Sequence, residues 1–197
     1  MIAYIDGKLT FKDATYVIIE TGGIGYQIKI SLNTYSSMRE GERCKLHTYL
    51  HIKEDAHTLF GFHELNEKRV FLNLISISGV GPTTAMMVLS SLGPAEIEQA
   101  IINEDVRTIQ SVKGIGGKTA QRIILELKDK IKKDSLASDG RSISANPYNT
   151  LRNEALSALV TLGIARNIAE KSIDSILKKE GNTISLEQLI KLALKTA

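Results

Sequence analysis

The sequence predicts a multidomain α+β protein with a small barrel, a helical domain and a three-helix bundle, in that order. The spacing of apolar residues changes from a period of two to the helical period of about 3.6 near residue 64. A glycine motif occurs twice in the helical part, and a stretch rich in Ser, Asn, Gly and Asp follows it. These observations give domains at 1–63, 64–133 and 150–197, with a flexible linker at 134–149.

The first 63 residues are expected to form five strands, near 2–11, 14–21, 24–31, 43–53 and 57–62. Residues 16–19 are β-branched or aromatic, residues 26–30 alternate, and the glycine-rich stretch between them suits a tight hairpin. Five short antiparallel strands in this length indicate a closed barrel. The OB-fold is the commonest five-stranded barrel, and an SH3-like barrel also fits the strand count.

The two later segments are expected to be helical. Between 64 and 133 the apolar residues fall into three helical stripes, around residues 65–75, 85–92 and 123–127. Three short helices are expected in 150–197, where Gly163 and Gly181 follow apolar runs, as helix-ending glycines do. Ser185 and Gln188 have the spacing of a capping box that starts the last helix.

Composition excludes several classes of protein. No segment has the roughly 18 unbroken apolar residues that cross a bilayer, and residues 1–10 lack the pattern of a secretory signal. Cys44 is the only cysteine, which excludes a disulfide framework and fits a reducing cytoplasm. The formal charge of +3 is too small to indicate nucleic-acid binding by itself. Any such binding must therefore depend on where the charges are placed.

The glycine motif is part of a longer internal repeat. Residues 79–92 align with residues 114–127 at an offset of 35 (114 − 79). The copies share two glycines, a threonine, an alanine and a final leucine, with Val or Ile between the glycines. A helical stretch precedes each copy and an amphipathic helix follows it. The chain is therefore predicted to contain two helix-hairpin-helix motifs.

The helix start after each hairpin is predicted to bind phosphate. Its first N–H groups have no intrahelical acceptor, the helix dipole adds partial positive charge, and glycine lets another backbone approach. Lys118 and Arg122 share one helix face and are expected to add charged contacts, while Val80 and Ile115 plug between helices. Backbone contacts to phosphate read no bases. The predicted DNA-binding residues are Gly79, Val80, Gly81, Thr83, Thr84, Gly114, Ile115, Gly116, Lys118, Thr119 and Arg122.

Other functions remain open for these residues. Gly117-Lys118-Thr119 looks like the end of a P-loop, which would make the chain an ATPase, but Val112 stands where that motif needs a glycine. The glycine pairs also match half of a dinucleotide fingerprint, or plain helix–helix turns. A helix-hairpin-helix glycosylase would need a catalytic aspartate, for which Asp134 and Asp139 lie at about the required distance.

No metal site, cofactor or catalytic arrangement is expected. Although His47 and His51 share a strand face, they lie about 13 Å apart at ~3.3 Å per residue, too far to bind one metal. His57 and His63 are likewise expected to be solvated or packed. No Ser/His/Asp arrangement with its motif context occurs.

Taken together, these features resemble the RuvA family of Holliday junction branch-migration subunits. The resemblance lies in the order of barrel, Gly-Val-Gly-Pro motif, Gly-Ile-Gly-x-Lys-Thr-Ala motif, linker and three-helix tail, and it covers essentially the whole chain. A lone hairpin motif is common among DNA-repair proteins, whereas this combination is much more specific. The resemblance extends to Met1–Gly7, Gly22–Tyr26, Lys53–Ala56, Leu59–Phe62 and Ala158–Gly163.

The resemblance implies a non-catalytic subunit that binds four-way junction DNA in recombination and repair. It implies a homotetramer, or an octamer, that holds the junction open and square and grips minor-groove phosphates through its hairpins. Glu54 and Asp55 match the family's acidic pin, four copies of which would repel phosphates at the crossover. Thr83 and Gly117 stand where basic residues are common in the family. The first hairpin is therefore expected to bind more weakly, or through a hydroxyl.

The C-terminal bundle would dock a RuvB-type hexameric ATPase, and a RuvC-type resolvase would be a further partner. The bundle has more leucine and isoleucine than one face can bury, which predicts an exposed docking patch. The expected docking residues are Leu156, Leu159, Leu162, Ile164, Leu189 and Ile190. The alternative function is structure-nonselective binding of duplex or single-stranded DNA by the barrel and hairpins.

Overall fold

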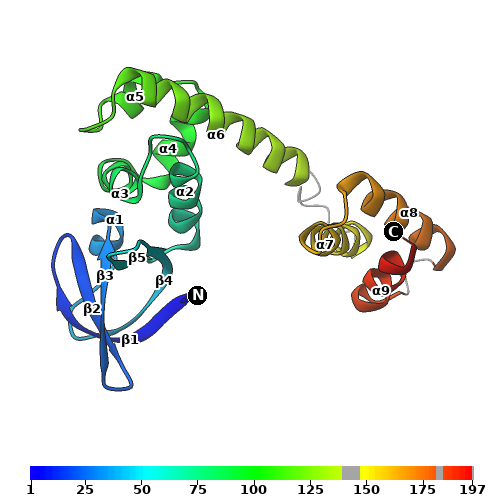
Figure 1. Ribbon diagram of the computed structural model, residues 1–197, viewed down its shortest axis with the longest axis horizontal. Helices are drawn as coiled ribbons and strands as arrows, with labels where there is room; N and C mark the ends of the chain where they lie inside the picture. The colour runs from blue at the N-terminus through cyan, green and yellow to red at the C-terminus, as the bar shows by residue number, and fades with distance from the viewer. Residues whose placement is uncertain (139–146, 181–183, 197) are drawn as a thin grey trace. The chain divides into compact units, whose positions relative to one another are not determined.

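A computed structural model describes residues 1–138, 147–180 and 184–196 (Figure 1). The chain divides into two compact units, Met1–Ile131 and Lys132–Ala197. The first unit contains the barrel and the helices up to most of α6, and the second contains the C-terminal bundle. Within the described residues, no helix is both long and apolar enough to span a membrane.

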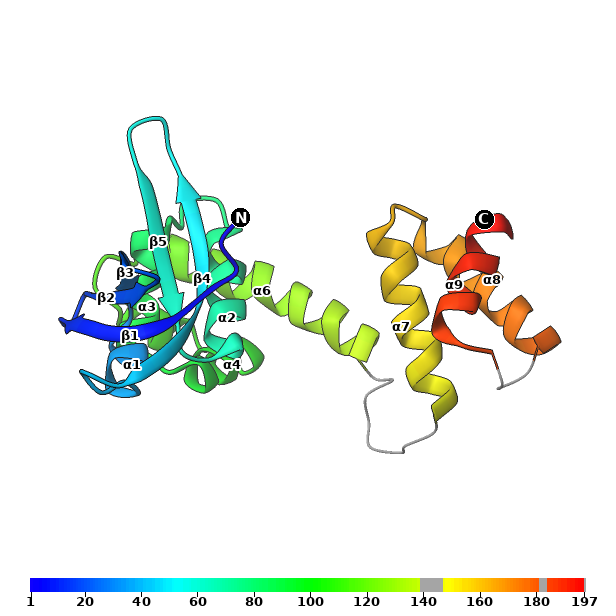
Figure 2. The same ribbon diagram turned by 90° about the horizontal axis from the view of Figure 1, so that it is seen from below.

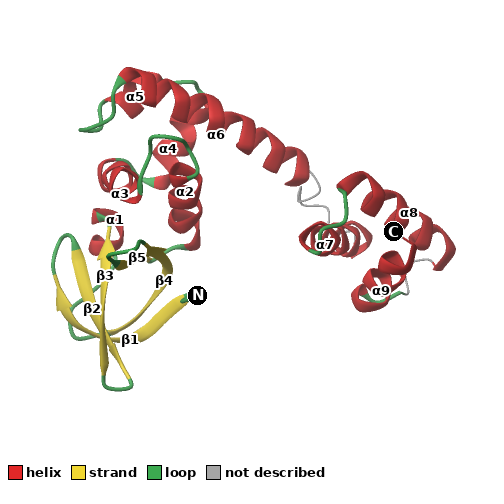
Figure 3. Ribbon diagram, viewed as in Figure 1, coloured by secondary structure: helices red, strands yellow, loops and turns green. Residues whose placement is uncertain are grey.

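Five strands form a closed barrel, as predicted: β1 (Tyr4–Lys12), β2 (Tyr16–Thr21), β3 (Ile24–Ile30), β4 (Arg43–Ile52) and β5 (His57–Phe62). Their order around the barrel is β1-β2-β3-β5-β4, with β3 and β5 parallel and the other neighbours antiparallel (Figure 3). This is the Greek-key order of an OB-fold, which decides between the two barrels that the strand count allowed. The predicted tight hairpin is present, because Gly22 (φ 59°) and Gly23 (φ 79°) both have positive φ.

Five helices follow the barrel in the first unit: α2 (Leu65–Ile75), α3 (Pro82–Ser91), α4 (Pro94–Ile102), α5 (Val106–Gln110) and α6 (Gly117–Ser138). Their buried residues form one core that includes Phe60 and Phe62 of β5. The Phe71 ring of α2 lies 4.8 Å from the Phe62 ring and 5.4 Å from the Phe60 ring, centroid to centroid. Barrel and hairpin helices therefore form a single packed body, although the sequence predicts separate domains at 1–63 and 64–133.

A buried carboxylate joins the barrel to α2. Glu67 accepts hydrogen bonds from the hydroxyls of Ser31 and Thr34, the latter at 2.6 Å, at the short unpredicted helix α1 (Leu32–Ser36). Each hydroxyl also accepts a backbone N–H, from Thr34 to Ser31 at 3.1 Å and from His63 to Thr34 at 3.0 Å. Burial raises the pKa of Glu67, and the two hydroxyl hydrogen bonds oppose that rise. This network fixes how the barrel meets the first hairpin helix.

The predicted linker begins inside a helix. α6 continues to Ser138 and α7 starts at Pro147, so residues 134–138 and 147–149 of the predicted linker are helical. The physical reason is that no glycine or proline interrupts α6 before Gly140. The remainder of the predicted linker, residues 139–146, lies outside the described residues.

The second unit is the predicted three-helix bundle, formed by α7 (Pro147–Thr161), α8 (Arg166–Glu180) and α9 (Leu186–Thr196). Gly163 follows α7 with φ 94°, as a helix-ending glycine does, whereas Gly181 lies outside the described residues. The predicted capping box is present, since the Gln188 N–H donates to the Ser185 hydroxyl at 3.2 Å and the Ser185 N–H to the Gln188 side chain at 3.4 Å.

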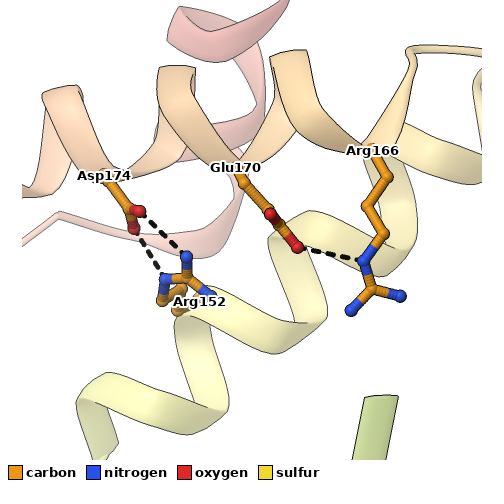
Figure 4. A network of polar contacts seen from close by, with 4 residues as sticks. All are labelled: Arg152, Arg166, Glu170 and Asp174. Carbon is orange, nitrogen blue, oxygen red and sulfur yellow. Dashed lines mark hydrogen bonds and ion pairs between the residues drawn. The ribbon is translucent and has the colours of Figure 1, made fainter. Parts of the chain in front are cut away.

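Ion pairs support the helices of this bundle (Figure 4). Arg152 on α7 donates to both carboxylate oxygens of Asp174 on α8, at 2.6 and 2.9 Å. The hydrogen bond from Arg152 is the main cause that lowers the pKa of Asp174. Arg166 pairs with Glu170 at 2.9 Å within α8. The bidentate pair of Arg152 with Asp174 joins α7 to α8, whereas the pair of Arg166 with Glu170 lies within α8 and supports that helix only.

Candidate nucleic-acid interface

The two predicted hairpins have nearly identical backbones. The first hairpin (residues 78–84) joins α2 to α3, and the second hairpin (residues 113–119) joins α5 to α6. Gly79 has φ 90° and Gly114 has φ 89°, values in the left-handed region where glycine is favoured. The first intrahelical bond is also the same, from Ala85 to the Gly81 carbonyl and from Ala120 to the Gly116 carbonyl, both 2.9 Å.

The middle residues of the hairpins are plugs, as the sequence predicts. Val80 is 4% exposed and Ile115 is 5% exposed, and both belong to the same core. The Val80 N–H donates to the Ile77 carbonyl at 3.0 Å, and the Ile115 N–H donates to the Val112 carbonyl at 3.1 Å. Neither the side chain nor the N–H of these plugs is left for DNA. We therefore expect Val80 and Ile115 to support the hairpins from inside the core and not to contact DNA.

The helix starts present N–H groups that donate to no acceptor within the described part of the chain. In the first hairpin these belong to Gly81, Thr83 and Thr84, because Pro82 has no N–H. The second hairpin offers one more, and its four are on Gly116, Gly117, Lys118 and Thr119. Unpaired N–H groups at a helix start are the usual protein site for phosphate oxygens.

Two glycines leave the approach to these N–H groups open. A Cβ built on Gly81 or on Gly116 would meet no atom within 4 Å. Gly81 has φ −87°, which any residue can adopt, so the fold itself does not require glycine there. The missing side chain instead leaves room for a ligand backbone to come close.

Charged side chains are unevenly distributed between the hairpins. Lys118 is exposed at the start of α6, and Thr83 occupies the equivalent exposed position on α3. Lys113 is also exposed, and sequence reasoning overlooked it, although it directly precedes Gly114. Arg122 has partners in its own chain. Its Nη1 donates to the Ser78 carbonyl at 3.2 Å, and its Nε lies 3.8 Å from the Glu126 carboxylate.

Glu54 and Asp55 lie at the tip of the β4–β5 hairpin, and both are exposed. The strand pairing ends at Ile52 and His57, and the Lys53 N–H donates to the Ala56 carbonyl at 2.9 Å to close the turn. Figure 2 shows this hairpin extending beyond the rest of the barrel. Both carboxylates are therefore presented at the outer end of a projecting arm.

The predicted docking residues of the bundle differ widely in exposure. Leu156 (7%), Leu159 (0%) and Leu189 (0%) are buried between the three helices, which corrects their assignment to an exposed patch. Ile164 and Ile190 are partly buried against the same core, and only Leu162 is largely exposed, at 61%. Sequence reasoning overlooked Val160 and Ile168, each 44% exposed, which flank the Gly163 turn together with Leu162.

The nucleotide-binding and glycosylase alternatives do not have the structural context that they require. Lys118 follows helix α5 and the second hairpin, whereas a P-loop lysine follows a strand and a phosphate-binding loop. Asp134 lies within α6, and Asp139 is outside the described residues. The described residues contain no group of three His, Cys, Asp or Glu side chains placed to hold a metal ion.

Comparison with known proteins covers the same three segments. The family "RuvA N terminal domain" matches residues 1–61, "SAM-like Helix-hairpin-helix tandem" matches 71–129 and "RuvA, C-terminal domain" matches 150–197. Similar proteins occur in Cytophaga hutchinsonii (59% identical over 197 residues), Christiangramia forsetii (52% over 195) and Amoebophilus asiaticus (48% over 196). Each match covers 99% of this chain and 99–100% of the relative, and each relative is named Holliday junction branch migration complex subunit RuvA. With its two hairpins and matching length, the chain belongs to the RuvA family of Holliday junction branch migration complex subunits.

Proposed function

We propose that this chain is the DNA-binding subunit of a branch migration complex and recognises four-way junctions by shape. The observation that carries the proposal is the pair of matched helix starts, each with unpaired N–H groups behind a bare glycine. Such groups bind the phosphate backbone and make no contact that distinguishes bases. Recognition would then depend on where several duplex arms present their phosphates at once.

The acidic tip of the β4–β5 hairpin would make the protein prefer junction DNA over linear duplex. A fourfold assembly would bring four copies of Glu54 and Asp55 together at the crossover, opposite the phosphates of the exchanging strands. At ~6–8 Å and an effective dielectric constant of ~20, each pair of carboxylate and phosphate charges repels by about 2–3 kcal/mol, which favours separated strands. The hairpins would attract the arms while the tips repel the centre. A homotetramer, or an octamer of two tetramers, is the assembly proposed here.

We propose further that the chain itself catalyses no reaction and binds no cofactor. A RuvB-type hexameric ATPase would supply the work of branch migration, and a RuvC-type resolvase would act on the same junction. The exposed apolar residues around the Gly163 turn, Val160, Leu162 and Ile168, support docking of the motor at that end of the bundle. The single cysteine supports a cytoplasmic location.

A band-shift competition tests the proposal. Four-way junction DNA and linear duplex of the same sequence are compared with the full chain at one fixed salt concentration. The junction is expected to bind more than about tenfold more tightly, a difference of about 1.4 kcal/mol. Equal affinity for the two DNAs would instead favour the structure-nonselective alternative, and ATP hydrolysis by the isolated chain would favour an ATPase.

The acidic tip is tested separately. The double variant Glu54→Ala, Asp55→Ala is expected to bind junctions as well as the natural chain but to separate strands less at the crossover, as reported by 2-aminopurine fluorescence. The matched control removes two exposed acids elsewhere on the barrel, Glu20→Ala with Glu40→Ala. Loss of all junction binding in the tip variant alone would argue against the pin role.

A further inference from the structure

Equivalent residues of the two motifs each reach the hairpin of the other motif. With the offset of 35, Met87 on α3 corresponds to Arg122 on α6 (122 − 87). Arg122 donates to the Ser78 carbonyl of the first hairpin at 3.2 Å. The Met87 methyl lies 3.4 Å from the position that a Cβ on Gly114 of the second hairpin would take. The two contacts are reciprocal, one polar and one apolar.

The polar contact acts on the peptide that sets the first hairpin. The Ser78 carbonyl belongs to the peptide bond that leads into Gly79, where the chain turns with φ 90°. Because a peptide unit is planar, fixing its oxygen fixes the orientation of the whole unit. The other bond within this turn is the one from Val80 to the Ile77 carbonyl. Arg122 therefore holds the Ser78 peptide in place, three residues before Gly81 and its unpaired N–H group.

Arg122 is poorly suited to act mainly as a phosphate ligand. One guanidinium nitrogen is already engaged by Ser78, and another lies beside the Glu126 carboxylate at 3.8 Å. That carboxylate partly offsets the positive charge that a phosphate would meet. Lys130, two turns further along α6, makes a second contact with the same region through the Ser76 hydroxyl. α6 is thus fastened along the segment that leads into the first hairpin.

We propose that Arg122 is a positioning residue for the first hairpin. This rests on the proposed function, in which both hairpins bind phosphate, and deepens it. The first hairpin, which has no cationic side chain, is held in position by α6. This helix begins at the second hairpin, which carries Lys118. The two sets of N–H groups are thereby presented to DNA as one unit, with a fixed distance between the phosphates that they bind.

Amide hydrogen exchange in the free, full-length chain tests this directly. Arg122→Ala is expected to speed exchange of the Val80 amide by about threefold or more, while the Ile115 amide in the same sample stays unchanged. Met87→Ala is the matched variant of the opposite contact, and it is expected to leave Val80 unchanged. Because no DNA is present, this result stands whether or not the proposed function holds. Unchanged Val80 exchange in Arg122→Ala overturns the proposal.

Junction binding supplies the second readout. Arg122→Ala is expected to lower affinity at every salt concentration without changing the slope of log Kobs against log[salt]. Lys118→Ala, the control for a direct contact, makes that negative slope shallower by about 0.9 for each subunit that contacts the junction. A similarly shallower slope for Arg122→Ala overturns the positioning role in favour of a direct phosphate contact. Should the alanine variant lose its fold, the same exchange comparison is made with Arg122→Met, which keeps a long side chain but has no donor for the Ser78 carbonyl, and unchanged Val80 exchange again overturns the proposal.

Discussion

In the first hairpin the helix start offers the N–H groups of three residues and no cation, whereas the second hairpin offers four N–H groups together with Lys118. Their backbones nevertheless agree to within one degree at the left-handed glycine. The residues that match are the glycines, the buried plug and the buried alanine that follows. Two pairs of residues differ: Thr83 against Lys118, which are exposed, and Pro82 against Gly117, which are half-buried. Hairpin geometry and phosphate affinity are therefore set by different residues and can vary independently.

Replacing the buried plug residues of the two hairpins is expected to have the largest effect, which is on the stability of the first unit. Ile115→Ala should lower the free energy of unfolding of the first unit by about 2–4 kcal/mol, because it leaves a cavity in the shared core. Val80→Ala should cost about 1 kcal/mol less, since valine has one methylene fewer. Urea unfolding followed by circular dichroism, with exposed Thr83→Ala as the control, measures both. A loss below about 1 kcal/mol for Ile115→Ala would contradict the role of the plug.

Adding a methyl group to the open glycines separates binding from folding. Gly81→Ala and Gly116→Ala should each weaken junction binding about tenfold, because the new Cβ occupies the approach to the N–H groups. Stability should fall by less than about 1 kcal/mol, since neither Cβ meets the protein. Gly79→Ala is the contrasting control, because its φ of 90° makes a side chain costly to the fold itself. Unchanged binding in both variants would show that phosphate does not approach there.

Exchanging the charge between the hairpins tests why they differ. Lys118→Ala should make the negative slope of log Kobs against log[salt] shallower by about 0.9 for each subunit that contacts the junction, and should weaken binding alike for every sequence. Thr83→Lys should make the slope steeper by about the same amount for each subunit, because it places a cation at the equivalent position. Both are measured by salt titration of junction binding. No gain in Thr83→Lys would mean that the first hairpin does not face a phosphate.

The smallest effect is expected from the proline. Pro82→Ala would give the first hairpin a fourth N–H group and so match the second. Affinity should rise by less than about threefold, and stability should fall by about 0.5 kcal/mol, because proline stiffens the unfolded chain and suits the first helical position. Calorimetric titration with junction DNA and thermal unfolding check the two changes. A loss of affinity would indicate that the proline ring itself contacts DNA.

Much of the local structure followed from the sequence because short-range chemistry decides it. Alternation located all five strands to within a few residues, and paired glycines located the tight turn. The capping box at Ser185 and the helix end at Gly163 formed as their spacing predicts. Residues 134–138 of the predicted linker continue α6 for the same kind of reason, since a polar stretch without glycine or proline can extend a helix.

The candidate site was predicted less completely. The repeat identified both helix starts. It did not show that Val80 and Ile115 are buried and that their N–H groups are bonded to carbonyls inside the turns, because that depends on the turn geometry. The sequence does not reveal that Arg122 contacts Ser78, because 44 residues separate the two. Likewise, the apolar residues of the bundle could not be divided into core and surface until the three helices were packed.

The sequence by itself determined the barrel, the two hairpin motifs, the bundle and the family, because each leaves a local pattern of spacing or a repeated motif. Only the tertiary structure showed that the core of the hairpin helices extends onto β5 of the barrel through Phe60 and Phe62, while the rest of the barrel keeps a core of its own. The buried Glu67 network adds a second link between the two. Only packing made Leu159 a core residue and Leu162 a surface one. Contacts between residues distant in the chain depend on how elements meet in space, and no short segment records that arrangement.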